Sequence, residues 1–120
     1  IVHGEGGLDE VSLSGPTKVH ALNSGKITNF FINPSDFGVE NQPLDSIKGG
    51  DAMYNARKLR ELLDGKIGAY RDIACINAAT ALVATNHEKE LNDAFKRAQS
   101  SIDTGAAKKA LDHLVLITNS

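Results

Sequence analysis

Residues 71–86, which read RDIACINAATALVATN, decide how the rest of this chain can be arranged. Apolar side chains lie almost all round the helix that this stretch would form, so we expect a helix that is buried on several sides. Its uncharged part, residues 73–86, is too short to cross a bilayer and contains Asn77, Thr80 and Thr85. The stretch therefore predicts a core helix that needs a sheet or other helices around it.

Three further helices are predicted before and after this core helix. Asp51 can cap the first, which ends at Gly65 and has one apolar stripe: Ala52, Ala56, Leu59 and Leu63. The next, over about 88–104, ends at Gly105 and has an apolar face: Leu91, Ala94, Phe95, Ala98 and Ile102. The last, over about 106–118, is expected to point three residues inward: Leu111, Leu114 and Val115.

The chain opens with the patterns of β structure. Residues 1–3 read as the end of a strand, and 4–7 as a loop. Val11 and Leu13 alternate with serines, which is typical of a half-buried strand. We expect a strand here as well, close to the start of the chain.

A hairpin is predicted next. Residues 17–22 and 26–32 have strand character and flank the sequence NSG, which is typical of a hairpin turn. Turn-forming residues at 33–38 end the second strand, and 44–47 can form one short helical turn.

These elements predict an α/β fold in which a few strands are followed by about four helices. Residues 1–50 are mostly strands and loops, and 51–120 are helical. Three or four strands do not balance four helices in a layered domain. The opening residues IVH also lie within a strand, whose backbone groups need a neighbour. We therefore expect this chain to be part of a larger α/β domain.

Composition excludes several classes of protein. The net charge is -2 and the pI about 6.1, which argues against a protein that binds a nucleic-acid backbone. Cys75 is the only cysteine, so the chain has no internal disulfide, and a cytoplasmic location is expected. No membrane-spanning segment or signal peptide is visible, so no membrane partner is expected.

Asp9 and Glu10 are the first candidates for chemistry. They follow the glycine-rich sequence HGEGG, and two adjacent carboxylates in a loop could bind one Mg²⁺ ion together with substrate phosphates. From the residue types alone, a pair of exposed carboxylates in a turn is the favoured explanation, because adjacent acidic residues are common. The glycines could approach a phosphate, or they could allow a tight loop with positive φ at Gly4, Gly6 or Gly7.

The other reactive residues are expected to be structural. The histidines have no metal-ligand spacing: His3, His20, His87 and His113. Cys75 is expected to be a small core residue, and Asn77 a buried amide whose hydrogen bonds are satisfied within the protein. Lys48 and the basic residues of the last two helices are expected to face solvent.

Four blocks of sequence, taken together, carry a family resemblance: VHGEGGLDEVSLSGPTKV (2–19), PSDFG (34–38), KGGDAMYNARKLRELLDGKIGAYRDIACINAATALV (48–83) and SIDTGAAKKALDHL (101–114). In this order and spacing, they resemble the C-terminal portion of the anthranilate phosphoribosyltransferase family. The resemblance implies the C-terminal part of the nucleoside phosphorylase/phosphoribosyltransferase-like α/β domain. The family's N-terminal helical domain and upstream sheet would then be absent from this chain.

The resemblance also implies an activity. The family transfers a phosphoribosyl group from 5-phosphoribosyl 1-pyrophosphate to anthranilate in tryptophan biosynthesis, releases pyrophosphate, and usually forms a homodimer. Asp9 and Glu10 match the family's acidic pair that binds Mg²⁺ at the pyrophosphate. The Gly6-Gly7 sequence departs slightly from the shorter loop of many members.

Three consequences follow from where this portion lies in the family. The main residues that bind phosphoribosyl pyrophosphate and anthranilate lie upstream, so no catalytic or substrate-binding residue is assigned to this chain. The 120 residues alone are expected to be inactive. Two alternatives remain, a nucleic-acid-binding relative without transferase activity and a pyrimidine nucleoside phosphorylase relative. The net charge and the Asp9-Glu10 pair count against the first, and the blocks GLDE and SGPT against the second.

Overall fold

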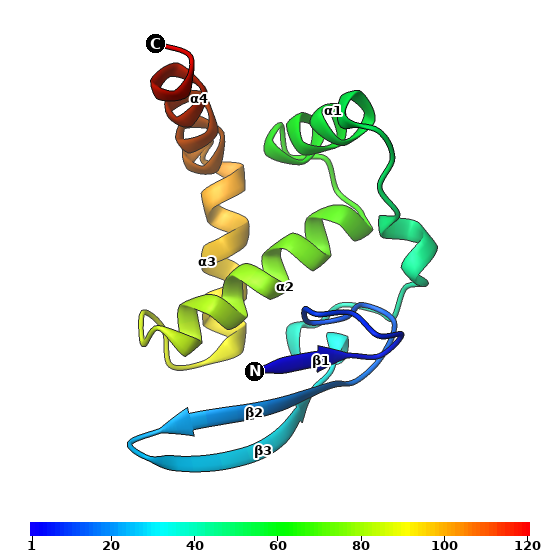
Figure 1. Cartoon of the computed structure of the whole chain (residues 1–120), viewed down its shortest axis with the longest axis vertical. Coiled ribbons are helices and arrows are strands. Elements are labelled where there is room, and N and C mark those ends of the chain that lie inside the picture. The colour runs from blue at the N-terminus through cyan, green and yellow to red at the C-terminus, as the bar shows by residue number, and fades with distance from the viewer.

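The computed structural model describes all 120 residues and has a mixed α/β fold (Figure 1). A small sheet lies at one end of the molecule, α2 crosses the middle, and α1 and α4 lie at the other end. The strands are β1 (Val2–Gly4), β2 (Thr17–Asn23) and β3 (Lys26–Ile32), and the 3-10 helices are η1 (Pro34–Phe37) and η2 (Leu44–Ile47). The α-helices are α1 (Ala52–Leu63), α2 (Ala69–Ala84), α3 (Leu91–Asp103) and α4 (Ala106–Thr118). Strands followed by four α-helices are the predicted arrangement.

The sheet is antiparallel, with the order β1-β2-β3. Val2 of β1 lies opposite Val19 of β2, and Asn23 of β2 lies opposite Lys26 of β3. Ser24 and Gly25 form the turn between β2 and β3 with φ of 49° and 79°. Positive φ at both central residues defines the type I′ turn, whose twist matches that of the strands. The predicted hairpin is confirmed.

The predicted strand at Val11 and Leu13 is wrong. These residues form no ladder with another strand, although both are buried. Ser12 between them is fully buried as well, whereas a half-buried strand would turn it to solvent. The alternation was misleading because the side chains of Asn77 and Thr17 and the backbone of Gln42, rather than a neighbouring strand, form the hydrogen bonds of this segment.

The core lies mainly between α2 and α3. Ile76 and Ala79 of α2 are fully buried, and the predicted apolar face of α3 is buried except for Leu91, which is half-buried. The ring of Phe37, from η1, lies 5.5 Å from that of Phe95, measured between centroids. Through this contact, α3 packs against the sheet end of the molecule.

Three helices are less buried than predicted. In α1, Leu62 and Leu63 are buried, but Ala52 and Leu59 of the predicted stripe are exposed. In α4 no residue is buried; Leu111 is half-buried, and both Leu114 and Val115 are exposed. The face of α2 that carries Ala78 and Ala81 is also exposed.

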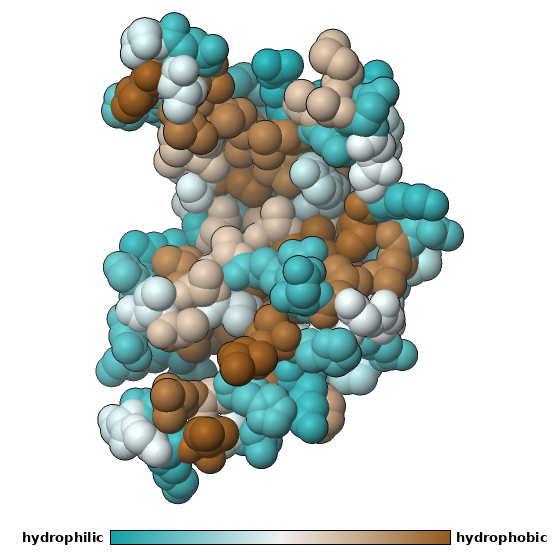
Figure 2. Space-filling model, in the orientation of Figure 1, coloured by the Kyte–Doolittle hydropathy of each residue, from teal (hydrophilic) through white to brown (hydrophobic).

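These exposed faces border a groove. It has a volume of about 580 Å³ and is lined by residues of all four α-helices, most of them apolar. Figure 2 shows apolar side chains in the hollow between α4 and α1. No α-helix of the chain has the length and apolar character needed to span a membrane.

Candidate functional site

The acidic pair follows a tight loop at the end of β1. The Gly4 N–H donates to the Leu8 carbonyl at 2.9 Å, and the Gly7 N–H donates to the Gly4 carbonyl at 3.2 Å. Gly6 and Gly7 have φ of 82° and 83°, which confirms the predicted need for glycine at these two positions. The loop thus returns the chain to β1 immediately before Asp9.

Gly4 is required for a different reason. Its φ is not positive, but a Cβ atom there would lie 2.6 Å from the Glu10 carbonyl oxygen and 2.9 Å from the Ser12 Cβ. Real Cβ atoms essentially never come so close to another atom. Only glycine at position 4 therefore lets the segment after the acidic pair lie directly on β1.

Hydroxyl groups hold the segment after the pair. The buried Ser12 N–H donates to Thr17 Oγ1 at 2.9 Å, and Ser12 Oγ donates to the Glu5 carbonyl at 3.2 Å. The Ser14 N–H donates to Ser12 Oγ at 3.1 Å. These bonds satisfy backbone groups that would otherwise be buried without a partner.

Asn77 of α2 holds the residue next to Glu10. Its Oδ1 accepts from the Val11 N–H at 2.8 Å, and its Nδ2 donates to the Val11 carbonyl at 3.0 Å. Nδ2 also donates to the Ile73 carbonyl within α2 at 3.0 Å. The prediction of an internally satisfied amide is confirmed, but no local sequence signal shows that its partner lies 66 residues away.

The two carboxylates differ in environment. Asp9 is exposed and Glu10 is half-buried. Burial, and secondarily the negative charge of Asp9, raises the pKa of the Glu10 carboxyl. No ion pair within the chain involves either carboxylate. The pair therefore has two adjacent negative charges that no cationic side chain compensates.

This donor set suits a hard cation. Mg²⁺ prefers oxygen ligands and is commonly held by one or two carboxylates, with substrate phosphates and waters completing its octahedron. Asp9 and Glu10 supply such carboxylates from a loop fixed on both sides. The chain gathers no group of three or more acidic, histidine or cysteine side chains able to hold a metal, so ligands from outside it would have to complete the sphere.

The structure also gives the surroundings of the other candidates. Cys75 is 1% exposed, and burial raises the pKa of its thiol, so little of the nucleophilic thiolate forms. Lys48 faces solvent. His3 and His113 are exposed, and His20 is half-buried.

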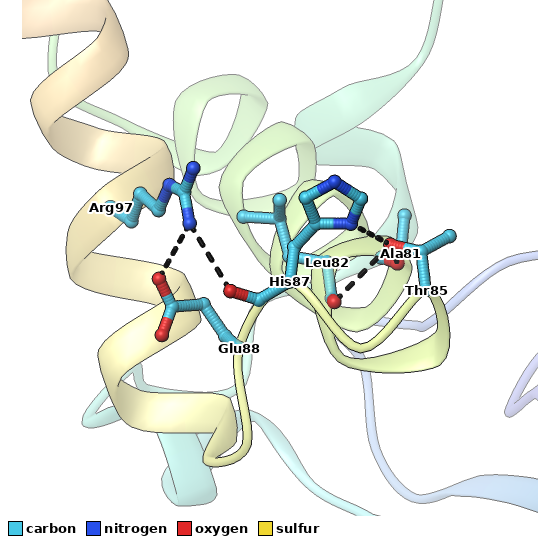
Figure 3. Close-up of polar contacts among 6 residues, drawn as sticks. All are labelled: Ala81, Leu82, Thr85, His87, Glu88 and Arg97. Atoms are coloured by element: carbon cyan, nitrogen blue, oxygen red, sulfur yellow. Dashed lines mark hydrogen bonds and ion pairs between the residues drawn. The ribbon is translucent and has the colours of Figure 1, made fainter.

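His87 lies in the loop between α2 and α3, at one end of the apolar groove. Figure 3 shows its Nδ1 hydrogen-bonded to Thr85 Oγ1, at 3.0 Å. Arg97 of α3 donates to the His87 carbonyl at 3.2 Å and pairs with Glu88 at 2.7 Å. These contacts tie the loop to α3, which is a structural role.

The sequence did not reveal the partner of Arg71. This side chain, on α2, pairs with Asp103 at the end of α3, with N–O distances of 2.8 and 3.0 Å. It also donates to the Gly65 carbonyl at 3.3 Å. Arg71 thereby joins α2 to α3 and to the end of α1.

Comparison with known proteins agrees with this arrangement. Residues 1–108 match the family model described as the a/b domain of the glycosyl transferase family. Among curated proteins, an anthranilate phosphoribosyltransferase of Sinorhizobium medicae is 48% identical over 120 residues, which are 100% of this chain and 35% of that protein. One of Xanthobacter autotrophicus is 46% identical over 118 residues, 98% of this chain and 34% of its own length.

Solved structures give the same result. The anthranilate phosphoribosyltransferase of Thermus thermophilus matches 99% of this chain and 35% of its own, with a TM-score of 0.87 and 29% identity. The Saccharomyces cerevisiae enzyme in complex with PRPP and Mg matches 94% of this chain and 33% of its own, with a TM-score of 0.85 and 31% identity.

The chain thus spans about a third of the length of these relatives. The resemblance found in the sequence is confirmed, and so is the α/β fold class. With 108 of its residues matched by one family model and its fold shared with these enzymes, the chain belongs to the glycosyl transferase family, as part of the family's a/b domain.

Proposed function

We propose that this chain is part of an enzyme that transfers the phosphoribosyl group of 5-phosphoribosyl 1-pyrophosphate to anthranilate. The products are N-(5-phosphoribosyl)anthranilate and pyrophosphate, as in tryptophan biosynthesis. The proposal is supported by similarity to enzymes of this name along nearly the whole chain. The Asp9-Glu10 pair, which has no compensating cation within the chain, is the feature of this segment that suits a metal and a pyrophosphate.

Asp9 and Glu10 would be the ligands that this segment contributes to Mg²⁺. Neither carboxylate attacks the sugar; both hold the cation where the negatively charged leaving group departs. Bound Mg²⁺ supplies Lewis-acid stabilisation of the charge that develops on pyrophosphate. The hydrogen-bonded loop would hold the backbone of the two carboxylates in place when the cation binds.

The remaining parts of the proposal concern the complete protein. This chain would be the C-terminal part of its large α/β domain, and a helical domain and the upstream sheet would precede it. The residues that bind most of the phosphoribosyl pyrophosphate and the anthranilate would lie there. The complete protein would be a cytoplasmic homodimer, and the 120 residues alone would be inactive. The relatives named here favour neither a nucleic-acid-binding protein nor a nucleoside phosphorylase.

A chimera tests the function. Residues 1–120 would replace the matching segment of the Sinorhizobium medicae relative, which is 48% identical. We expect loss of anthranilate fluorescence when Mg²⁺ and phosphoribosyl pyrophosphate are both present, and none with the 120-residue chain alone. A folded chimera without turnover would contradict the proposed activity, and a shift of single-stranded DNA in a gel would favour the nucleic-acid-binding alternative.

The double variant Asp9→Asn, Glu10→Gln tests the metal ligands. It keeps the size of both side chains but removes both charges, so we expect kcat/KM of the chimera to fall about 100-fold or more. Asp45→Asn is the matched control, because Asp45 is an exposed carboxylate on η2 without an ion pair. Unchanged turnover in the double variant would contradict the assignment of Asp9 and Glu10 as metal ligands, but not the proposed activity.

A further inference from the structure

The backbone that carries the acidic pair is held by three different elements. Gly4 of β1 lies under the Glu10 carbonyl, Thr17 of β2 accepts from the Ser12 N–H, and Asn77 of α2 binds both polar groups of Val11. Residues 11–13 belong to no strand. The side chains of Thr17 and Asn77 therefore form hydrogen bonds to Ser12 and Val11 that a neighbouring strand would otherwise form.

Of the three residues, Asn77 is the most distant in sequence from the acidic pair, and it binds the residue directly after the pair. Its amide plane lies against the peptide groups on both sides of Val11, with bonds of 2.8 and 3.0 Å. A third bond, to the Ile73 carbonyl, fixes the orientation of the amide on α2. The Val11 N–H belongs to the peptide bond that Glu10 forms, so a bond to it limits rotation of the Glu10 backbone directly.

From this geometry we infer that Asn77 is a positioning residue for the Asp9-Glu10 metal site, an inference that rests on the proposed function. Asn77 binds no metal itself. It fixes the peptide after Glu10 and thereby restricts the directions that the Glu10 side chain can take relative to Asp9. Loss of the amide frees that peptide and separates the carboxylates for part of the time.

Mn²⁺ in the presence of inorganic pyrophosphate is a suitable probe, because Mn²⁺ is paramagnetic and accepts the ligands that Mg²⁺ accepts, and pyrophosphate supplies ligands that the chain itself lacks. In the ¹⁵N-labelled 120-residue chain, low Mn²⁺ concentrations should selectively broaden the amide signals of residues 8–11. We expect Asn77→Ala to raise the Mn²⁺ concentration needed for half-broadening about tenfold, the size of effect typical of groups that orient metal ligands.

Asp103→Asn is the matched control for stability. It removes the ion pair of Arg71, which also joins α2 to its neighbours, but leaves the loop untouched. A merely structural role for Asn77 predicts that both variants shift the Mn²⁺ titration in proportion to their loss of stability. The positioning role predicts that only Asn77→Ala shifts it.

The outcomes separate the two proposals. If the wild-type chain shows no selective broadening, the metal assignment of Asp9 and Glu10 fails, and this inference fails with it. If the wild type binds Mn²⁺ and Asn77→Ala binds it equally, only the inference is overturned. Should the variant not fold, hydrogen exchange in the wild type decides: a Val11 amide that exchanges as fast as an exposed one would show that Asn77 does not hold it.

Discussion

At the scale of single residues, Arg71 is the buried charge on which the helices depend. It is 8% exposed, whereas its partner Asp103 lies at the surface. The hydrogen bond from the guanidinium, and then its positive charge, hold the pKa of the Asp103 carboxyl below its usual range. The pair therefore contributes stability that depends on pH.

The direction of this dependence follows from linkage. Because the folded-state pKa of Asp103 is lowered, its contribution is present at pH values above about 4, the pKa in the unfolded chain, and is lost as pH falls through the lower folded-state value. Asp72 acts in the opposite sense: burial raises its pKa, so the folded state gains stability when that carboxyl takes up a proton.

Asp103→Asn is expected to lower stability at pH 7 and to flatten the loss of stability in acid. Urea unfolding at a series of pH values between about 7 and 2 measures both effects. Asp72 is present in both proteins, so its contribution cancels in the comparison. Asp93→Asn, which breaks an exposed pair with Lys96 at 3.7 Å, should change little. If the stability of wild type and of Asp103→Asn changed with pH in parallel, the Arg71-Asp103 pair would not be a source of pH-dependent stability.

At the scale of elements, α1 depends on the N-cap residue that precedes it, Asp51. Asp51 Oδ1 accepts from the Tyr54 N–H at 2.8 Å, as the sequence predicted for an N-cap. Few residues of α1 are buried, so local interactions matter more for this helix than for α2 or α3.

Asp51→Ala should therefore lower the free energy of unfolding by about 1 kcal/mol. Asp51→Ser should lose much less, because its hydroxyl can accept the same hydrogen bond. Urea unfolding with an unchanged m-value measures the difference. Equal losses in the two variants would mean that the carboxylate acts through something other than the cap.

Element boundaries were predictable where local chemistry sets them. The turn at Ser24 and Gly25, the cap at Asp51 and the helix end at Gly105 depend on residues within a few positions of each other. The burial of α3 was predictable too, because its apolar face is wide and its opposite face is charged.

Predictions of burial and of strand structure were wrong where the outcome depends on contacts between residues far apart in the sequence. Leu114 and Val115 have the spacing of inward residues, yet α4 has no neighbour to cover them. Val11 and Leu13 alternate like a strand, but Asn77 and the backbone of Gln42, rather than a neighbouring strand, bind their backbone groups. The acidic pair could be identified from the sequence and its resemblance, whereas its supports come from β1, β2 and α2 and were visible only in three dimensions.

At the scale of the whole molecule, the chain is loosely built. Its Cα radius of gyration is 15.1 Å, compared with about 14 Å for a compact domain of this length. Only 21 of 120 residues are buried, so the core is small. Apolar residues of α4 remain exposed, among them Leu114, Leu116 and Ile117.

This surface should bind 8-anilinonaphthalene-1-sulfonate in the folded chain. We expect enhanced dye fluorescence without urea, and less of it in Leu116→Lys, because Leu116 is 68% exposed and the charge interrupts the apolar surface of α4. Thr118→Lys adds the same charge to the same helix without removing an apolar side chain, and should leave the fluorescence nearly unchanged. A native chain that does not enhance the dye would contradict this description of its surface.

The Asn77 contact has a consequence for how this segment can change during evolution. Asn77 binds residue 11 only through the backbone, which every amino acid except proline supplies in full. Position 11 can therefore drift among apolar residues that fill the same space. Position 77 has no such freedom, because only an amide of that length offers an acceptor and a donor to one residue. Although the two residues are in contact, position 11 would vary among related sequences and position 77 would be nearly invariant.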